Sequence, residues 1–185
     1  NAKLGPNCSV KGYAVKCKGL TQGLTSNLTM KNYTKTLVIT DSKLHGLLAS
    51  TIQNLTNLII LTVTNNILIN VTENMFINCW YMTKLNLQNN SICNISQNAF
   101  NGLSYLNNLK LGHNPISYLP DNTLMVLSNL RWLNLSYTQL VYVSEGMFTN
   151  NSELTHLDFS SSWLSKLTDK SLLGLESMRV LLLSH

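Results

Sequence analysis

Charged residues and long apolar runs are both scarce in this sequence. Only 11% of its 185 residues are charged, and no apolar stretch reaches the length needed to cross a lipid bilayer. The four cysteines include no Cys-x-x-Cys pair, which leaves a structural zinc site almost without support, and we expect no cofactor. A secretory signal peptide is also missing from the first residues, so we expect Asn1 to follow a processed leader.

A continuous basic stripe is missing as well. The net charge is +5, but the basic residues gather near the N-terminus and are scattered elsewhere. The early group consists of Lys3, Lys11, Lys16, Lys18 and Lys31. A surface that follows a phosphate backbone needs basic side chains along one face. The pattern therefore gives a nucleic-acid partner only weak support.

The sequence does contain a repeated unit of 24 residues. It is clearest from Met82 to Ile95, which reads MTKLNLQNNSICNI, and Met82 is taken here as position 1. Apolar residues recur at positions 4, 6, 11, 14 and 19 with no insertion between units. Position 4 holds Leu37, Leu61, Leu85, Leu109, Leu133, Leu157 and Leu181. This period and spacing are the signature of a leucine-rich repeat.

The apolar positions follow the alternation of a strand. Side chains at positions 4 and 6 should point into the protein, while those at positions 3, 5, 7 and 8 face outward. One repeat cannot bury its apolar face alone, but stacked repeats share one core. At position 9, Asn66, Asn90 and Asn114 should turn inward and satisfy backbone groups of adjacent turns. We expect weaker satisfaction from the shorter side chains there, which are Ser42, Thr138 and Ser162.

These observations predict a leucine-rich-repeat solenoid of the α/β horseshoe type, curved and right-handed. A parallel β-sheet should line its concave face, and irregular or short 3₁₀ segments its convex face. Residues 1–33 do not fit the repeat and should form an N-terminal cap. We expect repeats at 34–57, 58–81, 82–105, 106–129, 130–153 and 154–177, with a partial repeat at 178–185.

The cysteines fall into two pairs with different expectations. Cys8 and Cys17 are separated by eight residues within the cap, which favours a disulfide that helps to cover the edge of the first strand; two free thiols are the alternative. Cys79 takes position 22, where other repeats have leucine, so we expect it to be buried as a small apolar residue. The Cys93 side chain, at position 12, should point to the side of the solenoid rather than into its core. A bridge between Cys79 and Cys93 stays open as an alternative.

Asparagine sequons for N-glycosylation are dense in this chain. Of nine Asn-x-Ser/Thr sites, Asn7 is doubtful because Cys8 is its middle residue. The other eight indicate passage through the secretory pathway to the cell surface, the extracellular space or an endosomal lumen. They are Asn27, Asn32, Asn54, Asn70, Asn89, Asn94, Asn134 and Asn150. Asn134 lies at position 5 on the concave face, where a glycan would obstruct a ligand.

The outward positions of the fourth to sixth repeats carry the candidate ligand-binding residues. They combine aromatic, histidine and charged side chains, as interface hot spots do. We select Lys110, His113, Trp132, Tyr137, His156, Asp158 and Trp163. Trp132 and His156 share position 3 on neighbouring strands and should touch. The alternative is that these aromatic side chains only cover the sheet or contact a neighbouring repeat.

Catalysis is not expected from this surface. His156, Asp158 and Ser160 alternate along one strand, and residues two apart stand roughly 6.6–7 Å from each other, too far for the hydrogen bonds that activate a nucleophile. A metal held by His113, His156 and Asp158 is disfavoured because ligands must converge rather than stand in a row. We therefore predict a binding protein and not an enzyme.

Two segments, MFINCWYMTKLNLQNN and AFNGLSYLNNLKLGHN, carry Phe-x-x-Cys and Phe-x-x-Leu motifs on the predicted convex side. Together with the 24-residue unit and the Cys-x8-Cys leader that continues KGLTQGLTSNLT, they resemble the N-terminal part of a Toll-like receptor ectodomain. The resemblance covers nearly the whole chain and implies binding of a microbial or protein ligand, followed by receptor homo- or heterodimerisation. Neuronal, matrix and lamprey-type antigen receptors share the unit. The alternative is thus a secreted or cell-surface adhesion or matrix module that binds protein.

The resemblance leaves parts of such a receptor unmatched. The sequence has no cysteine-rich C-terminal cap, no membrane segment and no intracellular signalling domain. It stops at LLLSH, one residue before the next expected asparagine at position 9. We expect it to belong to a larger ectodomain, attached to a membrane only through segments outside this sequence.

Overall fold

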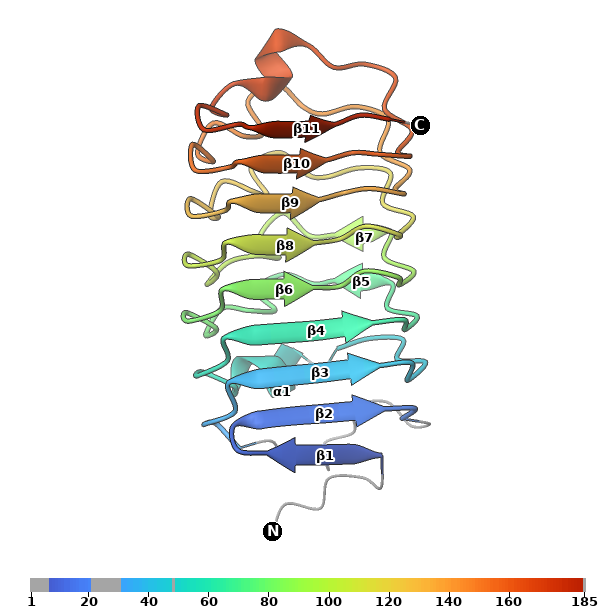
Figure 1. The fold of residues 1–185 in the computed structure, drawn as a ribbon, viewed down its shortest axis with the longest axis vertical. Coiled ribbons are helices and arrows are strands. Elements are labelled where there is room, and N and C mark those ends of the chain that lie inside the picture. Colours follow the sequence, from blue (N-terminus) through green and yellow to red (C-terminus); the bar gives the residue numbers. More distant parts are fainter. Residues whose placement is uncertain (1–6, 21–30, 48, 185) are drawn as a thin grey trace.

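The computed structural model describes residues 7–20, 31–47 and 49–184. Its main sheet has nine strands in the order β1-β2-β3-β4-β6-β8-β9-β10-β11, stacked along the long axis of the protein (Figure 1). The strands are Cys8–Lys11 (β1), Ala14–Lys18 (β2), Thr36–Thr40 (β3), Ile60–Thr64 (β4), Lys84–Asn86 (β6), Asn108–Lys110 (β8), Trp132–Asn134 (β9), His156–Asp158 (β10) and Val180–Leu182 (β11). Lys3, Asn27 and parts of the expected N-terminal cap lie outside the described residues.

The register of the sheet follows the 24-residue period. Strand β1 pairs with β2 antiparallel, and every later neighbour pair is parallel. Leu37 lies beside Leu61, and the same position-4 leucine recurs in register through β6, β8, β9 and β10 to Leu181 in β11. The predicted parallel-sheet solenoid of the leucine-rich-repeat horseshoe type is therefore confirmed.

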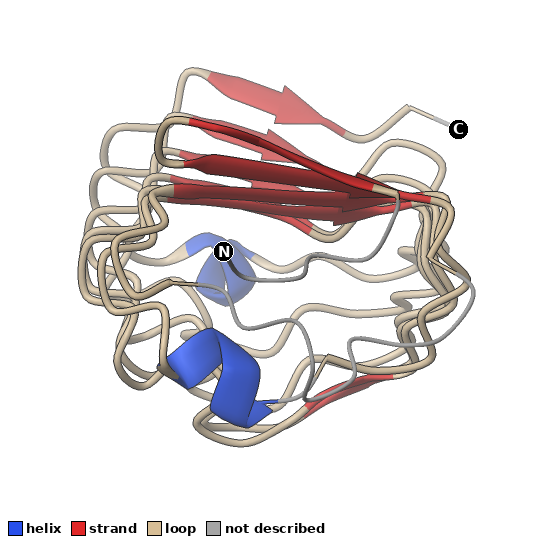
Figure 2. Cartoon of the chain, turned by 90° about the horizontal axis from the view of Figure 1, so that it is seen from below, coloured by secondary structure: helices blue, strands red, loops and turns tan. Residues whose placement is uncertain are grey.

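The opposite side of the solenoid has little regular structure. It carries one helical turn, α1 (Ala49–Gln53), a two-stranded parallel sheet of β5 (Asn70–Val71) and β7 (Asn94–Ile95), and a 3₁₀ turn, η1 (Asp169–Leu172). Figure 2 shows the main sheet along one side of the section, with α1 and the small sheet away from it. The irregular convex face is as predicted, except that the turn at α1 is α-helical rather than 3₁₀.

The core lies between these two sides and is built from the repeated apolar positions. Position-4 leucines from Leu37 to Leu157 are fully buried, and Phe76 and Phe100 stack in neighbouring repeats with ring centroids 6.5 Å apart. Leu183 differs from the expectation for position 6, because its side chain is 45% exposed. Strand β11 pairs only with β10, so no further repeat covers it in this structure.

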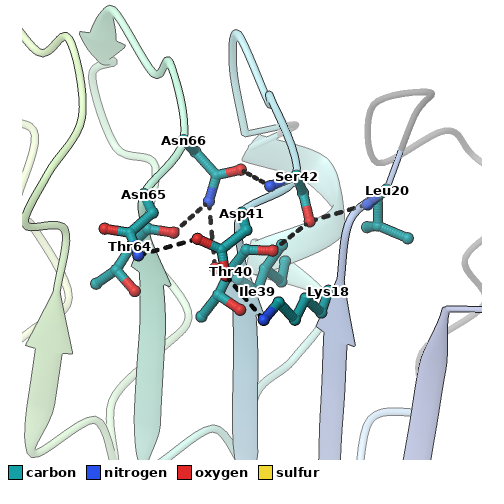
Figure 3. Close-up of polar contacts among 9 residues, drawn as sticks. All are labelled: Lys18, Leu20, Ile39, Thr40, Asp41, Ser42, Thr64, Asn65 and Asn66. Atoms are coloured by element: carbon teal, nitrogen blue, oxygen red, sulfur yellow. Dashed lines mark hydrogen bonds and ion pairs between the residues drawn. The ribbon is translucent and has the colours of Figure 1, made fainter.

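A ladder of buried polar side chains ties successive turns together at position 9 (Figure 3). The Asn66 carboxamide oxygen accepts from the Ser42 backbone N–H at 3.0 Å, and its amide nitrogen donates to the carbonyl oxygens of Ile39 and Thr64. Ser42 also links two turns, since its hydroxyl accepts from the Leu20 N–H at 3.1 Å. The predicted weakness at Ser42 is therefore only partial, because the cap brings a donor within its reach.

The other shorter side chains behave as predicted. Thr138 donates only to the Leu135 carbonyl and Ser162 only to the Phe159 carbonyl, each three residues earlier in the same turn. Neither hydroxyl reaches the preceding repeat. Asn114, in contrast, accepts from the Ile92 N–H, 22 residues earlier. Of Asn114, Thr138 and Ser162, only the longer asparagine side chain bonds to the preceding repeat.

The four cysteines form one disulfide bond and leave two free thiols. Cys8 and Cys17 form the predicted disulfide across the β1–β2 pair, where they are register partners. Cys79 is buried and donates its thiol to the Ile52 carbonyl, whereas Cys93 is exposed. The alternative bridge between Cys79 and Cys93 is wrong, because position 22 faces the core and position 12 faces solvent.

No helix in the described part of the chain is long and apolar enough to cross a membrane.

Candidate ligand-binding surface

Two aromatic stacks stand on the repeats that the sequence singles out. In the first, Trp132 of β9 and His156 of β10 are register partners at position 3, and their rings stack with centroids 4.4 Å apart and planes 8° apart. The predicted contact is therefore present. Trp132 remains 41% exposed, and the Nδ1 atom of His156 lies 2.9 Å from the Thr155 hydroxyl. The stack orders both rings while leaving much of the indole open to solvent.

The second stack lies at the other end of the strands. His113 and Tyr137 occupy position 8, with ring centroids 4.2 Å apart and planes 12° apart. Both have a left-handed backbone, with φ of 55° and 54°, and form the turn that leaves the strand. Positions 3 and 8 are five residues apart, about 16 Å along an extended chain. The predicted aromatic residues therefore form two groups at opposite ends of the same strands.

A polar row at position 5 separates the two stacks. The Asn134 amide donates to the Asp158 carboxylate at 2.8 Å, and the other carboxylate oxygen accepts from the Ser160 backbone N–H at 2.8 Å. Asn134 is also the acceptor for the Ser136 hydroxyl at 3.0 Å. Lys110, the register partner of Asn134, forms no ion pair with another described residue. The row thus places Lys110 on one side of Asn134 and, on the other side, a carboxylate whose oxygens both accept hydrogen bonds.

A shallow hollow adjoins the second stack. It encloses about 410 Å³, and its walls include Tyr137, Gln139, Ser161 and Trp163. Tyr137 is 56% and Trp163 62% exposed, which are high values for such large side chains. Trp163 therefore joins the position-8 group, although its repeat position is 10.

The geometry offers no catalytic arrangement within the described residues. The Asp158 oxygens accept from Ser160 and Asn134, and the His156 ring lies against Trp132. No group of three histidine, cysteine or acidic side chains in residues 7–20, 31–47 and 49–184 could hold a metal ion.

The sequons lie mostly on exposed turns. Side chains are exposed at Asn32, Asn54, Asn70, Asn89, Asn94 and Asn150, and Asn27 lies outside the described residues. Asn94 donates to the Asn70 carboxamide oxygen at 3.0 Å across the β5–β7 pair. Asn134 differs from all of these, because it is half-buried and its amide is bonded to Asp158. The glycosylation of each site stays a prediction.

Several exposed aromatic residues were not selected from the sequence. Trp80, Tyr81 and Tyr105 are 52%, 60% and 61% exposed at positions 23 and 24, and Tyr118 and Tyr142 lie 6.3 Å apart at position 13. All five stand outside the inward positions of the repeat, which is the signal that could have found them. They give the solenoid further aromatic surface away from the two stacks.

Comparisons with known proteins agree with this architecture. A family model described as leucine-rich repeat matches residues 81–140, and no curated protein matches the sequence. The solved TLR13–ssRNA13 complex aligns with a TM-score of 0.70 and 18% identity, over 82% of this chain and 26% of that chain. An internalin, InlF from Listeria monocytogenes str. 4b F2365, aligns with a TM-score of 0.63 and 23% identity, over 89% of this chain and 52% of that one.

The chain thus spans about a quarter of the length of the first of these proteins and about half of the second. Both alignments fall below 25% identity, so they concern the fold. The repeat period, the strand register and the match to the family model lead to the same conclusion. The chain folds as a leucine-rich-repeat solenoid, residues 81–140 match the leucine-rich-repeat family model, and the fold is similar to those of TLR13 and the internalin.

Proposed function

We propose that this chain is the ligand-binding part of an innate-immune pattern-recognition receptor of the Toll-like type. The observation that carries the proposal is the surface made by the two aromatic stacks and the polar row between them, called the stack surface below. It comprises Lys110, His113, Trp132, Tyr137, His156, Asp158 and Trp163. The resemblance of the sequence to a Toll-like receptor ectodomain supports the receptor class.

Preorganisation favours binding over mere coverage of the sheet. Free side chains lose rotamer freedom when a ligand orders them, at a cost of about 0.5–1.5 kcal/mol each. Stacking already holds the rings of Trp132 and Tyr137, so a ligand would contact surfaces that are largely fixed. Exposed Trp and Tyr beside a few charged groups are also the side chains that most often dominate binding energy.

The ligand is proposed to be microbial or a protein, and binding is proposed to support receptor dimerisation. The TLR13 structure was solved as a complex with single-stranded RNA, which makes RNA one ligand to test. The dense sequons support a location at the cell surface, outside the cell or in an endosomal lumen.

The test compares a variant with substitutions on the concave face and a matched control variant with a substitution on the side away from the main sheet. The chain would be immobilised and exposed to single-stranded RNA, a bacterial lipopeptide and bacterial cell-wall fragments, with binding followed by surface plasmon resonance. The double variant Trp132→Ala/His156→Ala removes the first stack. Tyr142→Ala removes a ring that is 47% exposed at position 13 of the same repeat as Trp132.

We expect at least one probe to bind the native chain and the Tyr142→Ala variant, and to lose affinity by about tenfold or more for the double variant. Equal binding by all three proteins would contradict the proposal.

A second candidate is an adhesion or matrix module that binds protein without immune signalling. It is favoured by Tyr118, Val141 and Tyr142, which are 44%, 41% and 47% exposed on the side away from the main sheet. Loss of binding in Tyr142→Ala, with full binding by the double variant, would support this candidate instead.

A further inference from the structure

The aromatic ladder at position 8 stops abruptly. His113 and Tyr137 stack in consecutive turns, and the next residue in the row is Ser161. All three have the same left-handed backbone, with φ of 55°, 54° and 52°. The backbone therefore continues unchanged from turn to turn, and only the ring is missing at the third place.

The missing ring leaves one face of Tyr137 open. Neighbouring strands lie roughly 4.8 Å apart, and the His113 and Tyr137 centroids are 4.2 Å apart with nearly parallel planes, so the stack runs along the repeat axis. His113 covers one face of the Tyr137 ring. The opposite face looks toward the turn of Ser161, whose hydroxymethyl group is too short to cover it.

The hollow described above lies at this place. It encloses about 410 Å³, within the range of sites that take small ligands, and Trp163 contributes a second aromatic wall. Gln139 and Ser161 add a carboxamide and a hydroxyl. None of the residues that line the hollow is lysine, arginine, aspartate or glutamate. The open face of the Tyr137 ring thus lies in the same hollow as the neutral hydrogen-bonding groups of Gln139 and Ser161.

We infer that this hollow is a subsite for a neutral pyranose ring of a glycan. The C–H face of the sugar would lie on the Tyr137 ring and extend the ladder that His113 begins. Hydroxyl groups at the sugar's edge would exchange hydrogen bonds with Gln139 and Ser161, while Trp163 flanks the ring. The inference rests on the proposed function, because it assigns a ligand class to one part of the stack surface.

Charge decides against the other flat ligands. A nucleotide brings a phosphate that favours lysine or arginine partners, and the lining has neither; its one histidine, His113, is stacked against Tyr137. A phenylalanine side chain would cover Gln139 and Ser161 without offering them any polar group, and a tyrosine or tryptophan side chain offers only one, whereas burying unpaired polar groups is unfavourable. A neutral sugar satisfies both the ring face and the polar edge.

Cellotetraose is the probe for the test. Its β-linked glucose units carry equatorial hydroxyl groups, so both faces of each ring present C–H groups. Binding would be measured by saturation-transfer NMR and by titration of the chain. The informative variant is Ser161→Tyr, because Tyr137 shows that a tyrosine accepts the same backbone conformation. The new ring would stack on Tyr137 and fill the hollow.

We expect cellotetraose to bind the native chain and to lose about tenfold in affinity for Ser161→Tyr and for Trp163→Ala. Trp80→Ala is the matched control, since this tryptophan is 52% exposed at position 23, and it should bind as the native chain does. Absence of binding to the native chain, or equal binding by Ser161→Tyr, would overturn the inference. The inference would also be overturned if Ser161→Tyr weakened the binding of a single-stranded oligonucleotide but left the binding of cellotetraose unchanged.

The two proposals can fail separately. If cellotetraose does not bind, but another probe still depends on Trp132 and His156, the sugar subsite is wrong and the proposed function stands. If no probe depends on either stack, both are wrong.

Discussion

The side-chain amide of Asn114 donates to the carbonyl oxygen of Leu87 in the preceding turn at 3.0 Å. It also donates to Leu111 within its own turn, and its carboxamide oxygen accepts from the Ile92 N–H. The turns that carry asparagine at position 9 depend on such a group, because buried backbone atoms between the strands and the convex loops need hydrogen-bond partners.

Removal of this amide should be costly. Asn114→Ala leaves several buried backbone groups unpaired, and we expect the free energy of unfolding to fall by about 2–4 kcal/mol. Thr138→Ala removes a hydroxyl that bonds only within its own turn, so a loss of about 1 kcal/mol is expected. Urea denaturation of the two variants measures the difference, and equal losses would show that the link between repeats contributes little.

Core and surface positions of the repeat should respond differently to truncation. Leu87 at position 6 is fully buried, and Leu87→Ala should destabilise the chain by roughly 2–5 kcal/mol by leaving a cavity. Trp132→Ala should leave the melting temperature nearly unchanged while weakening any ligand of the stack surface. Thermal unfolding followed by circular dichroism tests both, and a similar fall in melting temperature would mean that Trp132 is structural.

The two free cysteines should differ in reactivity. Burial raises the pKa of the Cys79 thiol from 9.0 to about 12, whereas Cys93 is exposed. Iodoacetamide at pH 8 should therefore label Cys93 in the native protein and Cys79 only after unfolding. Peptide mass spectrometry identifies the site, with Cys93→Ser as the control that should take up no label while folded. Rapid labelling of native Cys79 would contradict its buried position.

The same pKa shift predicts how stability responds to alkaline pH. The folded-state pKa lies above the unfolded value, so Cys79 adds no pH dependence while both states keep the thiol neutral, below pH 9. Between pH 9 and about 12 the unfolded chain ionises first, and the contribution of Cys79 to stability should decline. Urea midpoints of the native chain and Cys79→Ala over this range isolate the contribution. Parallel pH profiles would contradict the shift.

Much of the fold could be predicted because period and chemistry agree at every turn. Leu85 and Leu109 share position 4, and a constant 24-residue spacing without insertions places them side by side. Asn66 could be assigned to the inward ladder because a buried carboxamide needs both donor and acceptor partners, and the backbone groups of adjacent turns supply them. The hydrogen bond that the Leu20 N–H donates to the Ser42 hydroxyl could not be foreseen, since it depends on how the cap, which lacks the repeat, meets the first turn.

The candidate site was less accessible to prediction. The contact of Trp132 with His156 follows from their shared position 3, and the structure confirms it. The separation of Trp132 from Tyr137 depends on where β9 ends, at Asn134, because Tyr137 lies beyond that end in a left-handed turn at position 8. The hollow beside Ser161 depends on an absent ring, and a repeat pattern does not describe the space that a small residue leaves.

The measurement that tests the open stack surface most directly is peptide mapping of the secreted chain, with and without glycosidase, at Asn134. Asn134 lies in the polar row between the stacks, and its amide is bonded to Asp158. We predict that Asn134 carries no glycan while exposed sequons such as Asn54 and Asn150 do. A glycan on Asn134 would cover the surface between Trp132 and Tyr137 and contradict the proposal that ligands bind there.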